Sequence, residues 1–439
     1  MDRQSLNSAT TAPLLSNAMP PPESDFAEEG PQLHGFEWRQ ERPSTRSTAT
    51  APVDSTSSQR QPCTPRAPSP EEAPAPAGAL QDAAPAPTNT KPLSKNATYL
   101  YTVSHLIFFA ILGTLARLGL QALTFYTGAP VITGVLWANV TGSLVMGFLV
   151  EDKILFKEEW GAHNSSAPGQ KAIKKTIPLY IGLTTGFCGC CTSFSSFIRD
   201  VFLALSNSLP DPSLDSSIPS RSGGYSFMAL VAVILLTVSL SLSALIFGAH
   251  LALALGPYTP VISFRLTRRF LDPAMVFLGW GCWLGAVFMA IWPPDRNIAV
   301  ENWRGRAVFA IVFAPVGCLL RFYVSLHLNT RIPAFPVGTF VVNMFGTGIE
   351  GLCFNLQHVG AIAGFAGSVT GCQVLQGAMD GFCGATTTVS TWVAELNGLS
   401  KRRHAYSYGI ASITVALGLL VVIMGSLLWT RGFDTPVCG

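Results

Sequence analysis

The twelve residues GFCGCCTSFSSF, from Gly186 to Phe197, decide how this chain folds, because they return as GFCGATTTVSTW from Gly381 to Trp392. Both copies lie inside apolar segments. An internal repeat sets the architecture of a chain and has to be recognised before any other feature. The first expectation is therefore a duplicated unit.

Two further motifs recur around this stretch in the same order. They are Gly113-x-x-x-Arg117 and Asn139-x-x-Gly142-x-x-x-x-Gly147 in the first copy, and Gly317-x-x-x-Arg321 and Asn343-x-x-Gly346-x-x-x-x-Gly351 in the second. The arginine and the asparagine are 22 residues apart in both copies. The chain is thus a fusion of two related units.

The composition predicts an all-α polytopic membrane protein. Of the 439 residues, 49% are hydrophobic and only 12% are charged, whereas soluble domains carry about 25% charged residues. Nine apolar segments are close to the roughly 20 residues that a spanning helix needs. They cover residues 99–124, 130–150, 176–199, 226–255, 274–293, 307–328, 335–356, 371–395 and 405–429.

Segments one to four and six to nine form the two repeats, and segment five links them. One extra crossing inverts the second four-helix repeat relative to the first, a common plan for transport proteins. The expected boundaries are a proline-rich disordered tail at 1–95, repeats at 96–256 and 305–430, a linker with the fifth helix at 257–304, and a C-terminal tail at 431–439.

Loop charges predict a cytoplasmic N-terminus and an extracellular C-terminus, since basic residues concentrate in cytoplasmic loops. The loops placed inside hold Lys153, Lys157, Lys171, Lys174, Lys175, Arg265, Arg268, Arg269, Arg331, Lys401, Arg402 and Arg403. Those placed outside hold Arg221, Arg296, Arg304, Arg306 and Arg431.

Polar groups at membrane depth are costly and usually functional. Arg117 and Arg321 either attract anions or bind backbone carbonyls, and the sequence favours neither role. Asn139 and Asn343 either donate hydrogen bonds to a dehydrated anion or join helices to each other. The glycine runs before residues 189 and 384 predict a broken helix whose freed carbonyls line a cavity or coordinate a cation.

The fourth and ninth segments each contain a series of Ser and Thr residues, called here the hydroxyl rows. Their hydroxyl groups either contact a permeating ion or donate hydrogen bonds to backbone carbonyls of their own helix. The rows include Thr237, Ser239, Ser241 and Ser243, and Ser407, Ser412 and Thr414. Asp200 and Glu395 are expected at solvated helix ends. Glu350 and Asp380 are acids of the second copy only, and are paired, protonated or outside the pathway. The ten cysteines show no disulfide pattern, and those in apolar segments, Cys372 among them, are expected to pack as small apolar residues.

Together these motifs resemble those of the Fluc (CrcB) fluoride channels, and the fused repeat with its linking helix resembles the fungal fluoride exporters. The resemblance covers roughly residues 99–429. It implies an antiparallel pair of four-helix units with two potential pores, and a structural Na⁺ held by the carbonyls of Gly189, Thr192, Gly384 and Thr387. It also implies pore asparagines at Asn139 and Asn343, and pore phenylalanines at Phe194 and Phe197.

The second copy departs from the family pattern at the phenylalanines, where it has Val389 and Trp392. In the family each pore pairs the first aromatic of one unit with the second of the other. One pore would pair Phe194 with Trp392, and the other Val389 with Phe197. Aromatic edges are electropositive and can solvate an anion, so the hypothesis is that the Phe194–Trp392 pore conducts and the other is degraded.

The resulting expectation is a passive, fluoride-selective channel of the plasma membrane that works as a single chain. Neither a P-loop nor a nucleophile–histidine–acid arrangement is evident, so no enzyme is expected, and no nucleic-acid partner. An inside-negative potential favours the exit of F⁻ by ~2.3 kcal/mol per 100 mV, so a pore suffices. The alternatives are a proton-coupled small-solute exporter that uses Glu350 or Asp380, and a scaffold protein whose tail is the active part.

Overall fold

The computed structural model describes residues 95–160, 173–214, 220–293, 307–359 and 368–438. The predicted N-terminal tail, residues 1–95, lies outside the described residues except for Lys95. The basic loop residues at positions 171, 296, 304 and 306 lie outside them too. Every regular element in the described residues is helical. Seven helical segments there are long and apolar enough to cross a membrane. The prediction of an all-α polytopic membrane protein is therefore confirmed.

The first four predicted segments are all helical. They correspond to α1 (Lys95–Thr124), α2 (Val135–Glu151), a composite segment, and α8 (Gly223–Ala254). The composite segment consists of α5 (Pro178–Ile181), the π-helical stretch η1 (Gly182–Cys188), α6 (Gly189–Cys191) and α7 (Phe194–Leu205). The short helix α3 (Lys157–Trp160) follows α2, and the one-turn helix η2 (Gly256–Tyr258) follows α8.

The second half repeats this order. Its elements are α11 (Phe309–Leu328), α12 (Val337–His358), a second composite segment and α16 (Arg402–Thr430). The second composite segment consists of α13 (Val369–Gly377), the π-helical stretch η6 (Ala378–Cys383), α14 (Gly384–Thr386) and α15 (Ser390–Gly398). The two composite segments are thus built alike, as the sequence repeat predicts.

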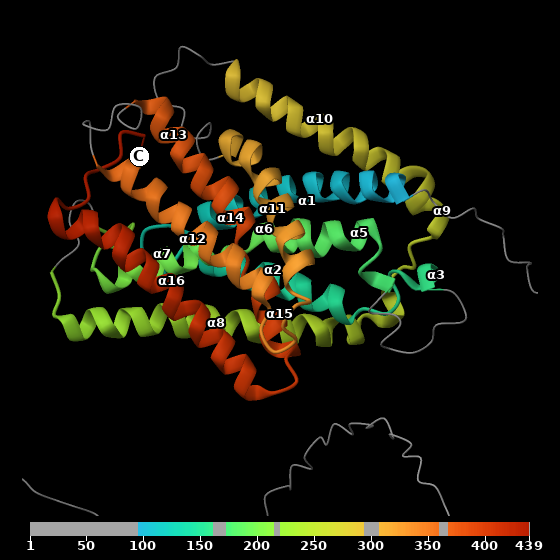
Figure 1. Cartoon of the computed structure of the whole chain (residues 1–439), viewed down its shortest axis with the longest axis horizontal. Coiled ribbons are helices and arrows are strands. Elements are labelled where there is room, and N and C mark those ends of the chain that lie inside the picture. The colour runs from blue at the N-terminus through green and yellow to red at the C-terminus, as the bar shows by residue number, and fades with distance from the viewer. Residues whose placement is uncertain (1–94, 161–172, 215–219, 294–306, 360–367, 439) are drawn as a thin grey trace, which may run out of the picture. The chain divides into compact units, whose positions relative to one another are not determined.

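The linking segment contains α9 (Phe264–Leu266), η3 (Thr267–Leu271) and α10 (Asp272–Ile291). α10 runs beside α1 at one edge of the bundle (Figure 1). Two indole N–H groups hold it there, from Trp280 to Ser104 Oγ at 3.1 Å and from Trp283 to the Val312 carbonyl of α11 at 2.9 Å. The fifth helix therefore contacts both halves.

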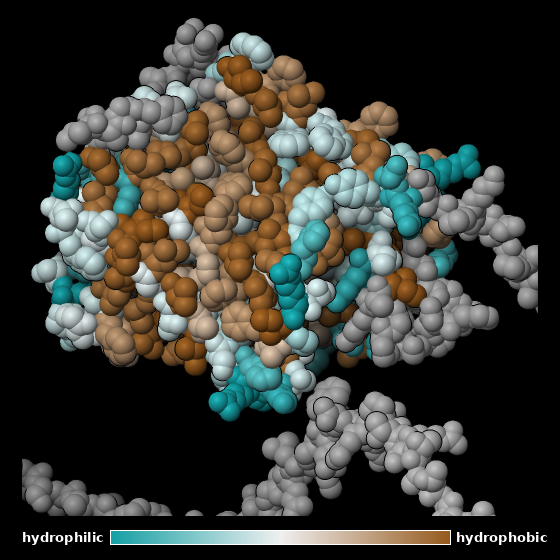
Figure 2. All heavy atoms as spheres, viewed as in Figure 1, coloured by the Kyte–Doolittle hydropathy of each residue, from teal (hydrophilic) through white to brown (hydrophobic). Residues whose placement is uncertain are grey.

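The outer surface of the bundle is apolar. Large exposed hydrophobic residues lie on α8, α10 and α16, among them Phe247, Phe277 and Val422. Figure 2 shows apolar side chains over the broad middle of one face, with hydrophilic residues toward its margins. Such a surface suits hydrocarbon surroundings, because large apolar patches are unfavourable in water.

Candidate functional site

The helix breaks lie three residues after the last glycine of each run. Thr192 is extended, with φ −94° and ψ 148°, and Thr387 has almost the same conformation, with φ −95° and ψ 157°. The glycine runs themselves remain helical, the first through η1 into α6 and the second from the end of α13 through η6 into α14. The predicted broken helix is observed, but threonine rather than glycine stands at the break.

The threonines at the breaks cap helices of the opposite half. Thr192 Oγ1 accepts hydrogen bonds from the backbone N–H groups of Val389 at 3.2 Å and Ser390 at 3.1 Å, at the start of α15. Thr387 Oγ1 accepts them from Phe194 at 3.2 Å and Ser195 at 3.1 Å, at the start of α7. The first N–H groups of a helix lack partners within the helix and need such acceptors. Each half therefore supplies the hydrogen-bond acceptor for the first N–H groups of a helix in the other half, at the centre of the bundle.

Each asparagine side chain binds the backbone of its own half just after the break. Asn139 Oδ1 accepts from the Ser193 N–H at 2.8 Å, and its Nδ2 donates to the Ser193 carbonyl at 3.4 Å. Asn343 does the same with Thr388, at 2.9 Å and 3.4 Å. An amide nitrogen carries two hydrogens. Each asparagine thus positions the break and keeps a second N–H for another acceptor.

Both arginines bind a backbone carbonyl of the other half, and Arg321 also binds one of its own half. Arg321 is buried, and donates from Nε to the Ala385 carbonyl at 2.8 Å and from Nη2 to the Thr185 carbonyl at 2.8 Å. Arg117 is also buried and donates from Nη2 to the Asp380 carbonyl. Of the two roles that the sequence left open, these contacts show carbonyl binding. One donor, Arg117 Nη1, is buried without a hydrogen-bond partner among the described residues.

The last glycine of each G-F-C-G motif makes room for an arginine of the opposite half. A methyl group on Gly189 would lie closer than 3.0 Å to the guanidinium of Arg321. A methyl group on Gly384 would meet the guanidinium of Arg117 in the same way. The glycines and arginines of the repeated motifs are therefore spatial partners.

The three predicted pore aromatics form one buried cluster. The rings of Phe194 and Trp392 meet edge-on, with centroids 5.3 Å apart and planes at 68°. Phe197 adds a second edge contact to Phe194, at 5.8 Å and 81°. All three side chains are 0% exposed, and so is Val389. The structure thus joins Phe194 to both partners, whereas the family pattern divides these residues between two pores.

The hydroxyl rows require a correction, because three of the predicted pore residues face outward. Ser239, Ser243 and Thr414 are exposed on the surface of the bundle. The hydroxyls on the inner faces of these helices are Thr237 and Ser241 in α8 and Ser412 in α16. A helix repeats every 3.6 residues, so neighbouring serines in a row fall on different faces. The Ser412 hydroxyl bonds back to the Tyr408 carbonyl at 2.7 Å, whereas the Ser241 hydroxyl has no partner among the described residues.

The acids are engaged within the bundle. Glu350 in α12 pairs with Arg199 in α7 at 2.9 Å, and Asp380 accepts from Gln376 at 2.7 Å. Arg199 was not predicted as a site residue, because the first copy has no acid at the position of Glu350 and the second has no arginine at the position of Arg199. Only folding brings these two unrepeated charges together.

The expectation of solvated helix ends at Asp200 and Glu395 is wrong. Asp200 is buried beside Arg199, with the two side chains 3.6 Å apart. Glu395 accepts hydrogen bonds from Asn329 at 3.1 Å, Thr339 at 2.6 Å and Tyr408 at 2.8 Å. Asp200 lies within α7 and Glu395 within α15, and neighbouring side chains of the bundle hold both carboxylates.

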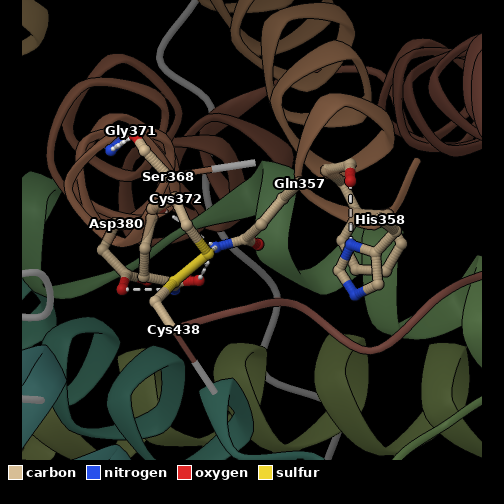
Figure 3. Close-up of a disulfide and its surroundings, with 9 residues drawn as sticks. Gln357, His358, Ser368, Gly371, Cys372, Asp380 and Cys438 are labelled. Carbon is tan, nitrogen blue, oxygen red and sulfur yellow. Dashed lines mark hydrogen bonds between the residues drawn. A yellow bond between two sulfur atoms is a disulfide. The ribbon is translucent and has the colours of Figure 1, made fainter. Parts of the chain in front are cut away.

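The expectation that the cysteines form no disulfide is also wrong, since Cys372, in an apolar segment, and Cys438 are joined by one (Figure 3). It ties the C-terminal segment to α13. Gln357 of α12 donates to the Cys372 carbonyl at 3.2 Å, and the Asp434 N–H donates to the His358 carbonyl at 3.0 Å. Cys438 was missed because it follows the last apolar segment, far from its partner in sequence.

A cavity of about 860 Å³ opens beside this disulfide. It is lined by residues of α1, α7, α12, α13 and η6, including Arg199, Asp200 and Asp380, and by Cys438 itself. Polar and charged groups of both halves therefore meet at this end of the bundle.

The four carbonyls expected to hold Na⁺ belong to buried residues around the two breaks. None of these oxygens accepts a hydrogen bond from a described residue outside its own short helix. Helices α6 and α14 are in contact, so the carbonyls of Gly189 and Gly384 lie in neighbouring elements. Unpaired carbonyls at broken helices are the groups that bind Na⁺ in transport proteins. The donor set fits a small hard cation.

These features define a helical membrane protein with a duplicated, broken-helix core. The family model described as CrcB-like protein, Camphor Resistance (CrcB), matches residues 105–249 and 308–426. The chain belongs to this family.

Curated relatives carry consistent names. The chain is 54% identical to fluoride export protein 1 of Neurospora crassa over 373 residues, which are 79% of this chain and 70% of that protein. It is 35% identical to fluoride export protein 1 of Candida albicans, over 79% of this chain and 85% of that protein. The fluoride-specific ion channel FluC of Acinetobacter baylyi is 38% identical over 27% of this chain and 81% of its own length. A bacterial relative thus corresponds to about one repeat. No solved structure matches the chain.

Proposed function

We propose that this protein is a passive, fluoride-selective channel that exports F⁻ from the cytoplasm. The observation that carries the proposal is the duplicated core, in which two asparagine amides and three aromatic rings surround the helix breaks. Amide and ring-edge hydrogens are uncharged donors that suit a small dehydrated anion. A named fluoride export protein and a named fluoride-specific ion channel are similar to this chain in sequence.

Reconstituted vesicles test this function directly. Fluoride and chloride efflux would be measured with ion-selective electrodes on vesicles that contain the purified protein, with empty vesicles as the control. We expect fluoride to leave at a channel-like rate while chloride is retained. Equal leakage of the two halides, or fluoride leakage no faster than from empty vesicles, would refute the proposal.

The structure gives little support to a proton-coupled exporter. Glu350 pairs with Arg199, and Asp380 is bonded to Gln376, so both acids considered as proton sites have fixed partners. The two mechanisms differ in flux, because a channel exceeds the turnover of a carrier by orders of magnitude and shows no coupling to pH. The chemistry proposed here is ion permeation and not catalysis.

One pore is proposed to conduct, the pore that contains Phe194 and Trp392. Their edge contact supports this assignment, while the aliphatic Val389 offers no ring edge to an anion. Fluoride efflux would be compared for Phe194→Ala and Phe197→Ala. A much larger loss for Phe194→Ala is expected, and equal losses would contradict the assignment.

Na⁺ is proposed as a structural ion, held by the carbonyls of Gly189, Thr192, Gly384 and Thr387. When bound it would neutralise four carbonyl dipoles at the junction of the halves. The guanidinium groups of Arg117 and Arg321 lie beside Gly384 and Gly189 and repel a cation. Na⁺ binds there only if its attraction to the four carbonyls exceeds that repulsion. The melting temperature of the purified protein should be higher in Na⁺ buffer than in N-methylglucamine buffer. Identical melting curves would exclude the ion.

The plasma membrane is the proposed location, with the N-terminus inside and the C-terminus outside. The Cys372–Cys438 disulfide supports this orientation, because disulfides persist in oxidising compartments and it joins two segments assigned to the outside by loop charge. A single chain is the proposed working unit, since the fusion already supplies both halves. Labelling of a tag after Cys438 in intact cells tests the orientation.

A further inference from the structure

Trp392 carries an unpaired hydrogen-bond donor in the middle of the aromatic cluster. Its side chain is 0% exposed, and its indole Nε1 has no partner among the described residues. The indoles of the linking helix behave differently, since Trp280 and Trp283 both donate to oxygen acceptors. The exception is therefore specific to the position inside the predicted pore.

An unpaired indole N–H is unfavourable at a buried site. Leaving a buried donor unsatisfied forfeits the hydrogen bonds that it makes to water, and native proteins rarely leave one without a reason. The first copy has Phe197 at the equivalent position, a side chain that fills a similar space without a buried donor. Packing alone therefore does not explain a tryptophan here.

The surroundings of the indole offer it no protein acceptor. The ring packs against that of Phe194, and its Cζ2 atom lies 3.9 Å from the place where a side chain on Gly409 of α16 would begin. The acid next along α15, Glu395, is occupied by Asn329, Thr339 and Tyr408. An acceptor for this N–H has to arrive as a mobile species.

We propose that the Trp392 indole N–H binds the permeating anion directly and makes this pore favour small, strongly accepting anions such as F⁻. The inference rests on the proposed channel function and adds a donor to it. An N–H group offers a stronger hydrogen bond than an aromatic C–H edge. Because it is uncharged, it binds fluoride without holding it as a fixed cation would. The second aromatic position then selects the ion as well as lining its path.

The experiment compares fluoride efflux from vesicles that contain the wild type, Trp392→Phe, or a variant with benzothienylalanine at position 392. The benzothienyl ring keeps the shape of the indole and replaces its N–H by sulfur. We expect both variants to lose about tenfold or more in fluoride flux, since hydrogen bonds to charged groups contribute about 1.5–3 kcal/mol. Trp429→Phe, on the outer surface of α16 at 68% exposure, serves as the matched control and should conduct like the wild type.

A second readout separates ion binding from a structural role. Removal of an unsatisfied donor should leave the melting temperature of the ion-free protein unchanged or raise it, while the increase caused by added fluoride should shrink. If Trp392→Phe and the benzothienyl variant keep wild-type flux and selectivity, the N–H is satisfied by water and the inference fails. If the wild type does not conduct fluoride at all, the proposed function fails and this inference with it.

Discussion

Replacing Arg199 by alanine should destabilise the protein strongly, because it leaves a buried carboxylate without its partner. Glu350 is 0% exposed and the Arg199 side chain only 18% exposed, and their charged atoms lie 2.9 Å apart. Removing one member of a buried ion pair typically costs 3–5 kcal/mol, roughly, whereas exposed pairs contribute about 0–1 kcal/mol. The observed burial places this pair near the first case, so we expect a loss of about 3–5 kcal/mol.

The structure also predicts which related variants are tolerated. Glu350→Gln should cost less than Arg199→Ala, because the remaining arginine still reaches the cavity and lies 3.6 Å from Asp200. The double variant Arg199→Met with Glu350→Leu should recover much of the loss, since buried pairs are often replaced by apolar residues at little cost. Arg403→Ala, at an exposed position in the first turn of α16, is the matched control and should be nearly neutral.

Unfolding of the purified protein in detergent, followed by circular dichroism against denaturant, measures these differences. A double-mutant cycle on the two positions gives their coupling energy. The reasoning would be refuted by a cost below about 1 kcal/mol for Arg199→Ala together with additive single and double variants, because that result belongs to a solvated pair.

Three further predictions concern the centre of the bundle and its outer end. Thr192→Val and Thr387→Val should each cost about 1–2 kcal/mol, as loss of a helix cap does, and the serine variants should retain most of the stability on the same denaturant curves. Gly384→Ala should lower the melting temperature, because its methyl group would displace the guanidinium of Arg117 from the Asp380 carbonyl, whereas Gly281→Ala, which faces open space, should melt like the wild type. Cys372→Ser should lower stability by about 2–4 kcal/mol and leave the partly exposed Cys438 thiol, which should react with an impermeant maleimide added outside the cell; no reaction would contradict the proposed orientation.

Much of the fold was predictable because membrane spans are long and uniform. All nine apolar segments are helical, and the broken core follows from the glycine-rich repeat. The position of the break was not predictable, because glycine signals a weak helix as readily as a close contact. Here Gly189 and Gly384 serve as close contacts, and the chain bends at the threonines that follow.

The details of the site depended on facts that a linear sequence does not contain. Which hydroxyls face inward depends on the rotation of each helix about its axis, so Ser239 was placed on the wrong face while Ser241 is buried. The partner of Glu350 is a residue that the repeat does not duplicate, and the partner of Cys372 lies beyond the last span. The sequence repeat identified the core that the two halves share. It gave no information on residues present in only one half, such as the Glu350 partner and the second disulfide cysteine.

The reciprocal threonine caps constrain how the two halves can diverge. Loss of a pore aromatic, such as the valine at position 389, affects one route through the membrane and leaves the other intact. Loss of Thr192 or Thr387 instead damages the helix that belongs to the opposite half. A half that no longer conducts is therefore still required, because its threonine caps a helix of the half that does conduct.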